Sequence, residues 1–280
     1  MRAPVQISSI TPDKTWSYAR PFPPLGFLPF SEFEFGNGDT FGLYWPIGKE
    51  QDEPLVAETW HDEWRVQPIY STLAHFLSAA EGLDDDEMPE PLPLADDPRS
   101  PRQCLVQAQK LTAEGDLEGA RGLLERAVDV LPEFTDALSA LWSIYVRTGH
   151  TKSAGDVAVR AVISPPCFGL RAFKALRWLR SADVDENVRR DPLWKRREAL
   201  TLEFGGTKHN DNYPLLLSAI EDYLDKSMYE RALTLMQTYG EFMSSETTAF
   251  QDRYGFDRES YVKRQIEVST LLPGGPRNAF

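Results

Sequence analysis

An internal repeat with a period of 34 residues constrains this chain more than any other feature. Four positions of residues 104–132 return at that offset, namely Gly115, Ala120, Ala127 and Pro132 as Gly149, Ala154, Ala161 and Pro166. Glycine takes the left-handed conformation that ends a helix at little cost, small alanines let two helices approach closely, and proline stops a helix. The pattern therefore predicts two successive copies of a helix–turn–helix unit.

The spacing resembles the tetratricopeptide repeat (TPR) family, which has a period of about 34 residues. That resemblance implies a helical solenoid that binds other proteins, and it leaves the ligand open. Weaker helical patterns continue at residues 170–179, 191–202, 214–242 and 254–271. We therefore expect residues 99–272 to form an all-α, TPR-like domain and residues 273–280 to be a disordered tail.

The N-terminal part has a different pattern, made of short apolar runs separated by turn residues. Strands are predicted at residues 27–30, 33–35, 41–47, 55–60 and 65–70, and Asn37-Gly38 is a strong hairpin signal. A short helix is expected at 72–80, capped by Ser71. The overall prediction is an α+β protein, in which a small antiparallel sheet domain precedes the helices.

The order of these runs resembles the SUKH superfamily over about residues 25–80. The residues that carry the resemblance are Gly36-Asn37-Gly38-Asp39, the apolar run 41–47, His61-Asp62-Glu63 and the segment 71–77. Many bacterial members are immunity proteins against secreted toxins, so the resemblance implies that role. SUKH domains usually begin with helices, whereas here a proline-rich arm precedes the sheet, so residues 1–80 are expected to be a truncated SUKH-like domain.

Charge divides the chain at residue 98. Residues 1–98 hold 18 acidic and 5 basic side chains, and residues 99–280 hold 25 of each, so the net charge of −13 belongs to the first part. Such a field disfavours nucleic acid and anionic membranes and favours a cationic partner, although acidity also aids solubility. Residues 81–98, with eight acids and four prolines, are expected to be an extended linker that can lie along a surface.

A basic cluster at residues 171–197 has two interpretations. In the favoured interpretation, the cluster is the solvated side of two helices or contacts the acidic N-terminal part. Contact with nucleic acid, aided by Trp178 and Trp194, is the alternative.

The candidate partner-binding residues are acids and aromatics of the sheet region, because aromatic side chains bury large areas at interfaces. They are Asp39, Tyr44, Trp60, Asp62, Glu63 and Trp64. The four histidines and two cysteines show no zinc-ligand spacing, and no phosphate loop or Gly-x-Ser-x-Gly elbow is present, so we expect no metal, no cofactor and no catalytic residue. Loss of a turnover on His61→Ala substitution would revive the enzyme hypothesis.

The sequence thus favours a cytoplasmic immunity protein that blocks a cognate toxin, one with a cationic surface, by direct contact. The alternative is a TPR adaptor that holds a peptide or a partner protein. No apolar run or signal segment predicts a membrane association, and the oligomeric state stays open.

Overall fold

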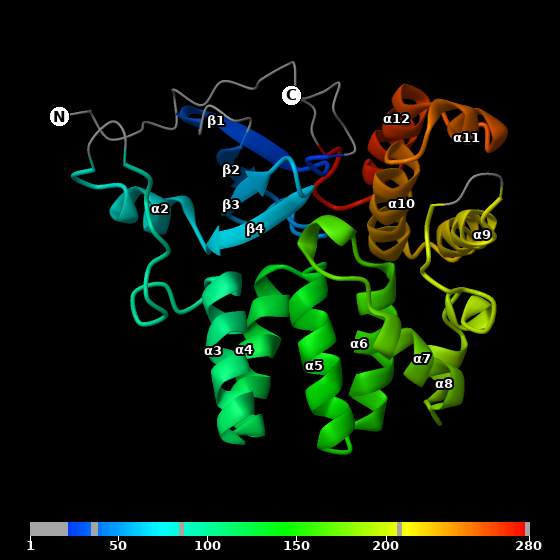
Figure 1. Cartoon of the computed structure of the whole chain (residues 1–280), viewed down its shortest axis with the longest axis horizontal. Helices are drawn as coiled ribbons and strands as arrows, with labels where there is room; N and C mark the ends of the chain where they lie inside the picture. Colours follow the sequence, from blue (N-terminus) through cyan, green and yellow to red (C-terminus); the bar gives the residue numbers. More distant parts are fainter. Residues whose placement is uncertain (1–21, 35–38, 84–86, 206–208, 278–280) are drawn as a thin grey trace.

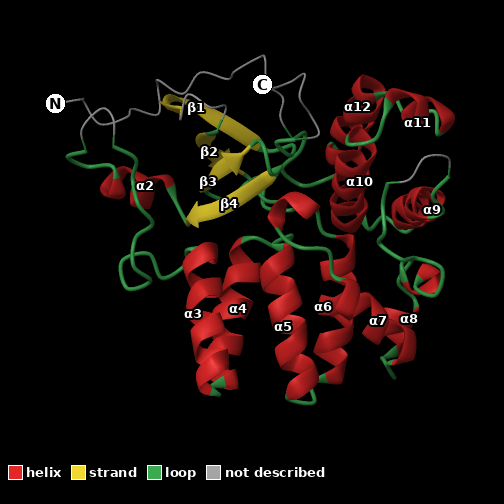
Figure 2. Cartoon of the chain, in the orientation of Figure 1, coloured by secondary structure: helices red, strands yellow, loops and turns green. Residues whose placement is uncertain are grey.

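The computed structural model describes residues 22–34, 39–83, 87–205 and 209–277. A small sheet lies across the ends of four long helices, and a further group of helices stands beside them (Figure 1). Strands occur only in the N-terminal part of the described chain, and helices make up most of the remainder (Figure 2). The predicted α+β class is confirmed at this level.

The sheet is an antiparallel meander of four strands in the order β1-β2-β3-β4. Its strands are β1 (Phe27–Glu34), β2 (Thr40–Tyr44), β3 (Leu55–Trp60) and β4 (Arg65–Tyr70). Trp60 pairs with Arg65 across the β3–β4 turn. The predicted turn at 36–38 lies outside the described residues.

Side chains alternate between the two faces of the sheet along each strand, and other elements cover both faces. Phe27, Tyr44 and Leu55 face the helices and belong to the same core as the helical residues. Phe41 lies on the other face, where α2 (Leu73–Ala79) and residues 88–92 cover it. Thr72, not Ser71, caps α2, since its side chain accepts a hydrogen bond from the His75 amide.

The described part of the acidic linker packs against the sheet. The Tyr70 hydroxyl donates to the carbonyls of Pro89 and Glu90, and the buried Asp97 carboxylate accepts hydrogen bonds from the amide and hydroxyl of Ser71. Polar contacts to the sheet therefore hold this segment, which turns at residues 94–96 and so is not extended throughout.

Two helix pairs occupy the repeat region, as the 34-residue offset predicts. They are α3 (Pro101–Glu114) with α4 (Leu117–Val130), and α5 (Thr135–Arg147) with α6 (Thr151–Ile163). Gly115 and Gly149 follow α3 and α5 with φ of 90° and 78°, the left-handed values that the sequence predicts. Ala120 and Ala154 are fully buried, so their small size lets the paired helices touch.

The remaining helices agree with the sequence in part. The elements are η2 (Pro166–Phe168), α7 (Phe173–Ser181), α8 (Glu186–Arg189), η3 (Trp194–Arg196), α9 (Asn212–Asp225), α10 (Tyr229–Ser244), α11 (Thr248–Arg253) and α12 (Arg258–Ser269). The helical patterns at 214–242 and 254–271 are confirmed, since the first forms α9 and α10 and the second contains α12. The helix predicted at 191–202 is wrong, because only the short η3 forms there while Leu200 and Leu202 anchor an irregular segment in the core.

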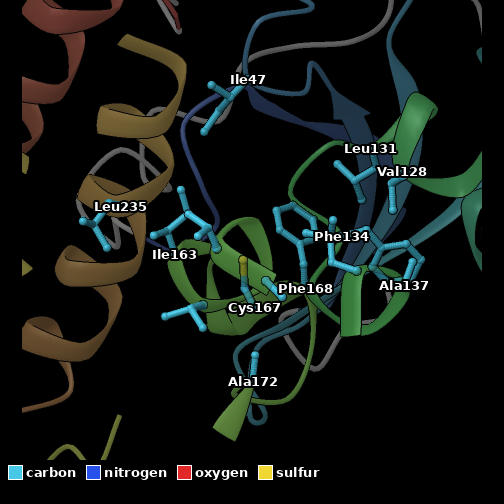
Figure 3. Close-up of a cluster of buried hydrophobic side chains, with 14 of the residues drawn as sticks. Ile47, Val128, Leu131, Phe134, Ala137, Ile163, Cys167, Phe168, Ala172 and Leu235 are labelled. Atoms are coloured by element: carbon cyan, nitrogen blue, oxygen red, sulfur yellow. The ribbon is translucent and has the colours of Figure 1, made fainter. Parts of the chain in front are cut away.

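The sheet and the helices share one hydrophobic core. The Tyr44 ring lies 5.2 Å from the Phe168 ring, and Figure 3 shows Phe134, Cys167 and Phe168 gathered in this core. Residues 273–277 also pack, contrary to the predicted disorder, because the buried Arg277 side chain donates to the Leu25 and Trp45 carbonyls. Within the described ranges, no helix has both the length and the apolar run needed to cross a bilayer.

Candidate binding cleft

The β3–β4 turn holds a tryptophan in a strained conformation. Trp64 has a φ of 51°, and its amide donates to the His61 carbonyl at 3.3 Å. This left-handed conformation suits glycine or asparagine and costs other residues about 1–2 kcal/mol. The side chain is 36% exposed and stacks on Phe22 with a 5.6 Å centroid separation, so the turn holds an aromatic ring at the surface.

An acid–histidine cluster fixes the same end of the sheet. The Asp39 carboxylate accepts from the His61 amide at 2.7 Å and lies 2.9 Å from its Nδ1, while Asp62 lies 3.0 Å from the His61 Nε2. The hydrogen bond to Asp39 raises the pKa of His61. Because a protonated imidazole donates from both nitrogens, this ring can join both carboxylates.

A cleft of about 460 Å³ opens below the turn, which we call the Trp64–Leu170 cleft. Four segments far apart in the chain line it: the β3–β4 turn, the loop between η2 and α7, residues 204–205, and the C-terminal end of α10 with the two residues after it. The residues that line it include Glu63, Trp64, Arg65, Leu170, Arg171, Phe204, Glu241 and Phe242.

Asp136 fixes the wall that carries Leu170. Its carboxylate accepts from the Leu170 amide at 2.7 Å and from Arg65 at 3.1 Å, so it joins the loop to β4. Gly169 has a φ of 159°, and a Cβ there would lie 2.4 Å from Asp136 Oδ1. These contacts hold Leu170 with 77% of its surface in solvent.

The opposite wall is aromatic. The Phe204 and Phe242 rings stack with a centroid separation of 3.8 Å and an interplanar angle of 13°. The Arg171 guanidinium lies 5.8 Å from the Phe242 ring centre and 5.2 Å from that of Phe173. Apolar side chains therefore face the cleft from two sides, with a cation between two of the rings.

A buried carboxyl group forms part of the floor. Glu241 accepts from the Cys167 amide at 3.0 Å and from the Gln237 side chain at 2.7 Å. Burial raises the pKa of Glu241 to about 7, although both hydrogen bonds oppose that shift. The site thus contains an acid that changes its charge near neutral pH.

This pKa predicts a pH-dependent stability. Between about pH 4.5 and 7 the folded protein keeps a proton on Glu241 that the unfolded chain has released, so the free energy of unfolding falls as the pH rises, by about 3 kcal/mol in total. Glu241→Gln should flatten this part of the curve, measured by urea denaturation from pH 4.5 to 8. The buried Glu133, whose pKa is also raised, leaves a residual slope. An identical pH dependence in wild type and variant would refute this role of Glu241.

A larger groove of about 970 Å³ lies between α4, α6 and the start of α10. Its charges pair with one another, since Arg231 bonds to both Asp156 and Asp191. The Tyr145 hydroxyl likewise donates to Glu125 at 2.7 Å. Satisfied internal pairs make this groove a weaker candidate than the Trp64–Leu170 cleft.

The structure brings most of the six predicted residues together. Asp39, Asp62, Glu63 and Trp64 lie at or beside the β3–β4 turn, with the half-buried Trp60 as the last residue of β3. Tyr44 is a wrong choice as a contact residue, because it is 1% exposed and its hydroxyl donates to Glu133 at 2.6 Å.

The sequence did not identify the helical side of the cleft. Leu170 and Phe173 share helical spacing with Leu176 and Leu179, and this pattern predicted one buried face. Only Leu176 and Leu179 are buried, because α7 begins at Phe173 and Leu170 lies on the preceding loop. Over the described ranges, no cluster of three or more histidine, cysteine or acidic side chains is arranged to hold a metal ion.

Comparison with known proteins relates the chain to one family. Residues 12–89 match the model of the YfbP N-terminal domain, and residues 203–277 match that of the YfbP C-terminal domain. Neither is a SUKH or TPR model. The cleft lies where these two regions meet, with Trp64 on one and Phe242 on the other. Escherichia coli (strain K12) has a relative, "Uncharacterized protein YfbP", that is 38% identical over 275 residues, which cover 98% of this chain and 97% of the relative. The chain belongs to the YfbP family.

Proposed function

We propose that this protein binds another protein, which inserts an apolar side chain into the Trp64–Leu170 cleft. The observation that carries the proposal is the exposure of three large apolar side chains in and beside this cleft, whereas the other two exposed ones of the described residues, Val146 and Leu271, lie away from it. Leu170 is 77% exposed, Phe173 41% and Trp64 36%. Burying such side chains contributes about 1.5–3 kcal/mol each, and tryptophans often dominate the energy of an interface.

The rigidity of the cleft supports the same conclusion. Leu170 is held by Asp136, and Trp64 is held by a strained turn, so neither needs to be ordered when a partner binds. Binding sites that are formed in advance lose less conformational entropy on association.

Within this proposal, we favour toxin immunity as the biological role. The acidic turn with Asp62 and Glu63 suits a cationic toxin surface, because complementary charges speed association. The SUKH-like order of the N-terminal segments is the further argument. The partner would be the toxin domain encoded beside this gene.

The adaptor role is the second candidate, and the α3–α4 and α5–α6 pairs favour it. Their 34-residue offset and their left-handed glycines support an assignment as TPR units, stacked as the start of a solenoid. An adaptor would bind through the same cleft but would protect no cell from a toxin.

Co-expression with the neighbouring toxin domain tests both roles. Wild type should restore growth, whereas Leu170→Asp should lose protection and weaken binding at least tenfold in calorimetry. Trp64→Gly should also weaken binding while leaving the melting temperature nearly unchanged, because glycine relieves the strain of the turn and offsets the lost contact with Phe22. Leu271→Asp is the matched control, since Leu271 is exposed away from the cleft.

The protection assay decides between the roles, and the binding of the variants tests the site. Failure of wild type to protect would exclude immunity against that toxin and favour the adaptor. Full binding by both Leu170→Asp and Trp64→Gly would exclude the cleft as the binding site.

A further inference from the structure

A row of four basic side chains runs along α7 and the loop before it, starting at the cleft. Arg171, Lys174, Arg177 and Arg180 recur every third residue and are all exposed. With a rise of about 1.5 Å per residue, the part of the row on α7, from Lys174 to Arg180, spans roughly 9 Å, and Arg171 extends it from the preceding loop. It therefore matches the length of a short peptide segment.

Two of the guanidinium groups are held in place by main-chain carbonyls. Arg180 donates to the carbonyls of Arg197 and Leu200 at 3.0 and 2.6 Å, and Arg171 donates to that of Leu202 at 2.9 Å. Each guanidinium carries five N–H donors, so further donors remain for a ligand. The row is thus partly ordered before any partner arrives.

No acid neutralises this row. In the part of the chain that the structure describes, none of the four cations forms an ion pair with a carboxylate, whereas Arg189 at the end of α8 and Arg190 just after it both do. Carbonyl oxygens are neutral acceptors, so the positive charge stays uncompensated. Of the two favoured interpretations, the solvated one fits these four side chains, since they form no ion pair with the acids of residues 22–34, 39–83 and 87–98. Arg65 of β4 pairs with Asp136 of α5.

We infer that the partner carries an acidic segment that lies along α7 and continues from the apolar side chain in the cleft. This inference rests on the proposed function and adds an acidic segment to a partner whose surface opposite Asp62 and Glu63 is cationic. The exposed Leu170 and Phe173 stand at the start of the row, so an apolar anchor followed by acidic residues fits the order of the surface. The carboxylates of Asp62 and Glu63, on the opposite side of the cleft, repel the acidic segment, so it extends away from the turn.

A peptide fits this surface better than a nucleic acid. Apolar Leu170 and Phe173 flank the row, and the chain has a net charge of −13 that repels a polyanion at long range. A short acidic peptide feels the local row more strongly than this distant field, because salt screens charges beyond about 10 Å.

Selection from a phage-displayed library of random 12-residue peptides tests this inference. Wild type should enrich peptides that combine aspartate or glutamate with leucine or phenylalanine. Lys174→Glu/Arg177→Glu should abolish that acidic enrichment and weaken a selected peptide at least tenfold in fluorescence anisotropy. Lys110→Glu/Lys263→Glu is the control, since it makes the same change in net charge at exposed sites on other helices.

Three outcomes separate this inference from the proposed function. Neutral or basic selected peptides that Leu170→Asp no longer binds would overturn the acidic segment and leave the cleft intact. Peptides that bind both the Leu170→Asp and the charge-reversed proteins unchanged would overturn both proposals. Binding of a 20-nucleotide thymidine strand that depends on Lys174 and Arg177, with no acidic peptide enriched, would identify the row as a nucleic-acid contact and overturn the inference.

Discussion

Replacing Arg277 with alanine should lower the free energy of unfolding by about 3–5 kcal/mol, although the residue lies in a glycine- and proline-rich segment. Arg277 is 3% exposed and forms an ion pair with the buried Glu50 at 2.5 Å. It also donates to the carbonyls of Leu25 and Trp45 at 2.6 and 2.7 Å. Its removal leaves a buried carboxylate and two carbonyls without their donor, which costs more than the loss of the contact itself.

Urea denaturation at pH 7.5 measures this effect. Two further variants show whether the buried charge causes it. Arg264→Ala removes a half-exposed arginine that pairs with Glu221, and it should cost less than 1 kcal/mol. Arg277→Ala/Glu50→Gln should recover part of the loss, because the buried charge is then gone. A cost below 1 kcal/mol for Arg277→Ala would show that residues 273–277 do not fasten the sheet.

The sequence could not predict this contact, because its local pattern points the other way. The stretch Pro273-Gly274-Gly275-Pro276 is typical of a disordered tail. Order comes from tertiary contacts, above all those of Arg277 with residues more than 220 positions away, and the hydrogen bond from the Gln51 side chain to the Pro273 carbonyl adds to them. Composition reports the conformational freedom of a segment, whereas such a tertiary contact depends on a surface built by other parts of the chain.

The elements that the sequence did predict are those whose cause is local. Gly115 and Gly149 end their helices because of their own conformational freedom, and β3 and β4 form from short, largely apolar runs bounded by turn residues. The turn with Asp62, Glu63 and Trp64 was a candidate site for the same reason, since an aromatic residue beside acids stands out in any sequence window.

The other side of the cleft lacks such a signal. Phe204 and Phe242 are 38 residues apart, and each reads as an ordinary core residue until the fold stacks them. Leu170 has the spacing of a buried helical residue and is exposed only because the helix begins three residues later. A cleft between segments far apart in the chain therefore needs the structure.

Arg231 should give the second large effect, because it neutralises an acid in the core. Asp191 is 3% exposed and accepts hydrogen bonds from the Tyr223 hydroxyl at 2.6 Å and the Leu193 amide at 2.8 Å, besides its pair with Arg231. Asp156, on the other side of the same guanidinium, is about half exposed. Arg231 thus forms two ion pairs, one with a buried carboxylate and one with a half-exposed carboxylate.

Arg231→Ala should lower the free energy of unfolding by about 3–5 kcal/mol, since it leaves the Asp191 charge buried alone. Asp156→Ala should cost less than 1 kcal/mol, because water replaces its partner. A double-mutant cycle in urea between Arg231→Ala and Asp191→Asn should show a coupling above about 1 kcal/mol, since asparagine can accept the Tyr223 and Leu193 bonds without a charge. Equal costs for Asp156→Ala and Arg231→Ala, with no coupling, would mean that burial of Asp191 does not set the strength of this network.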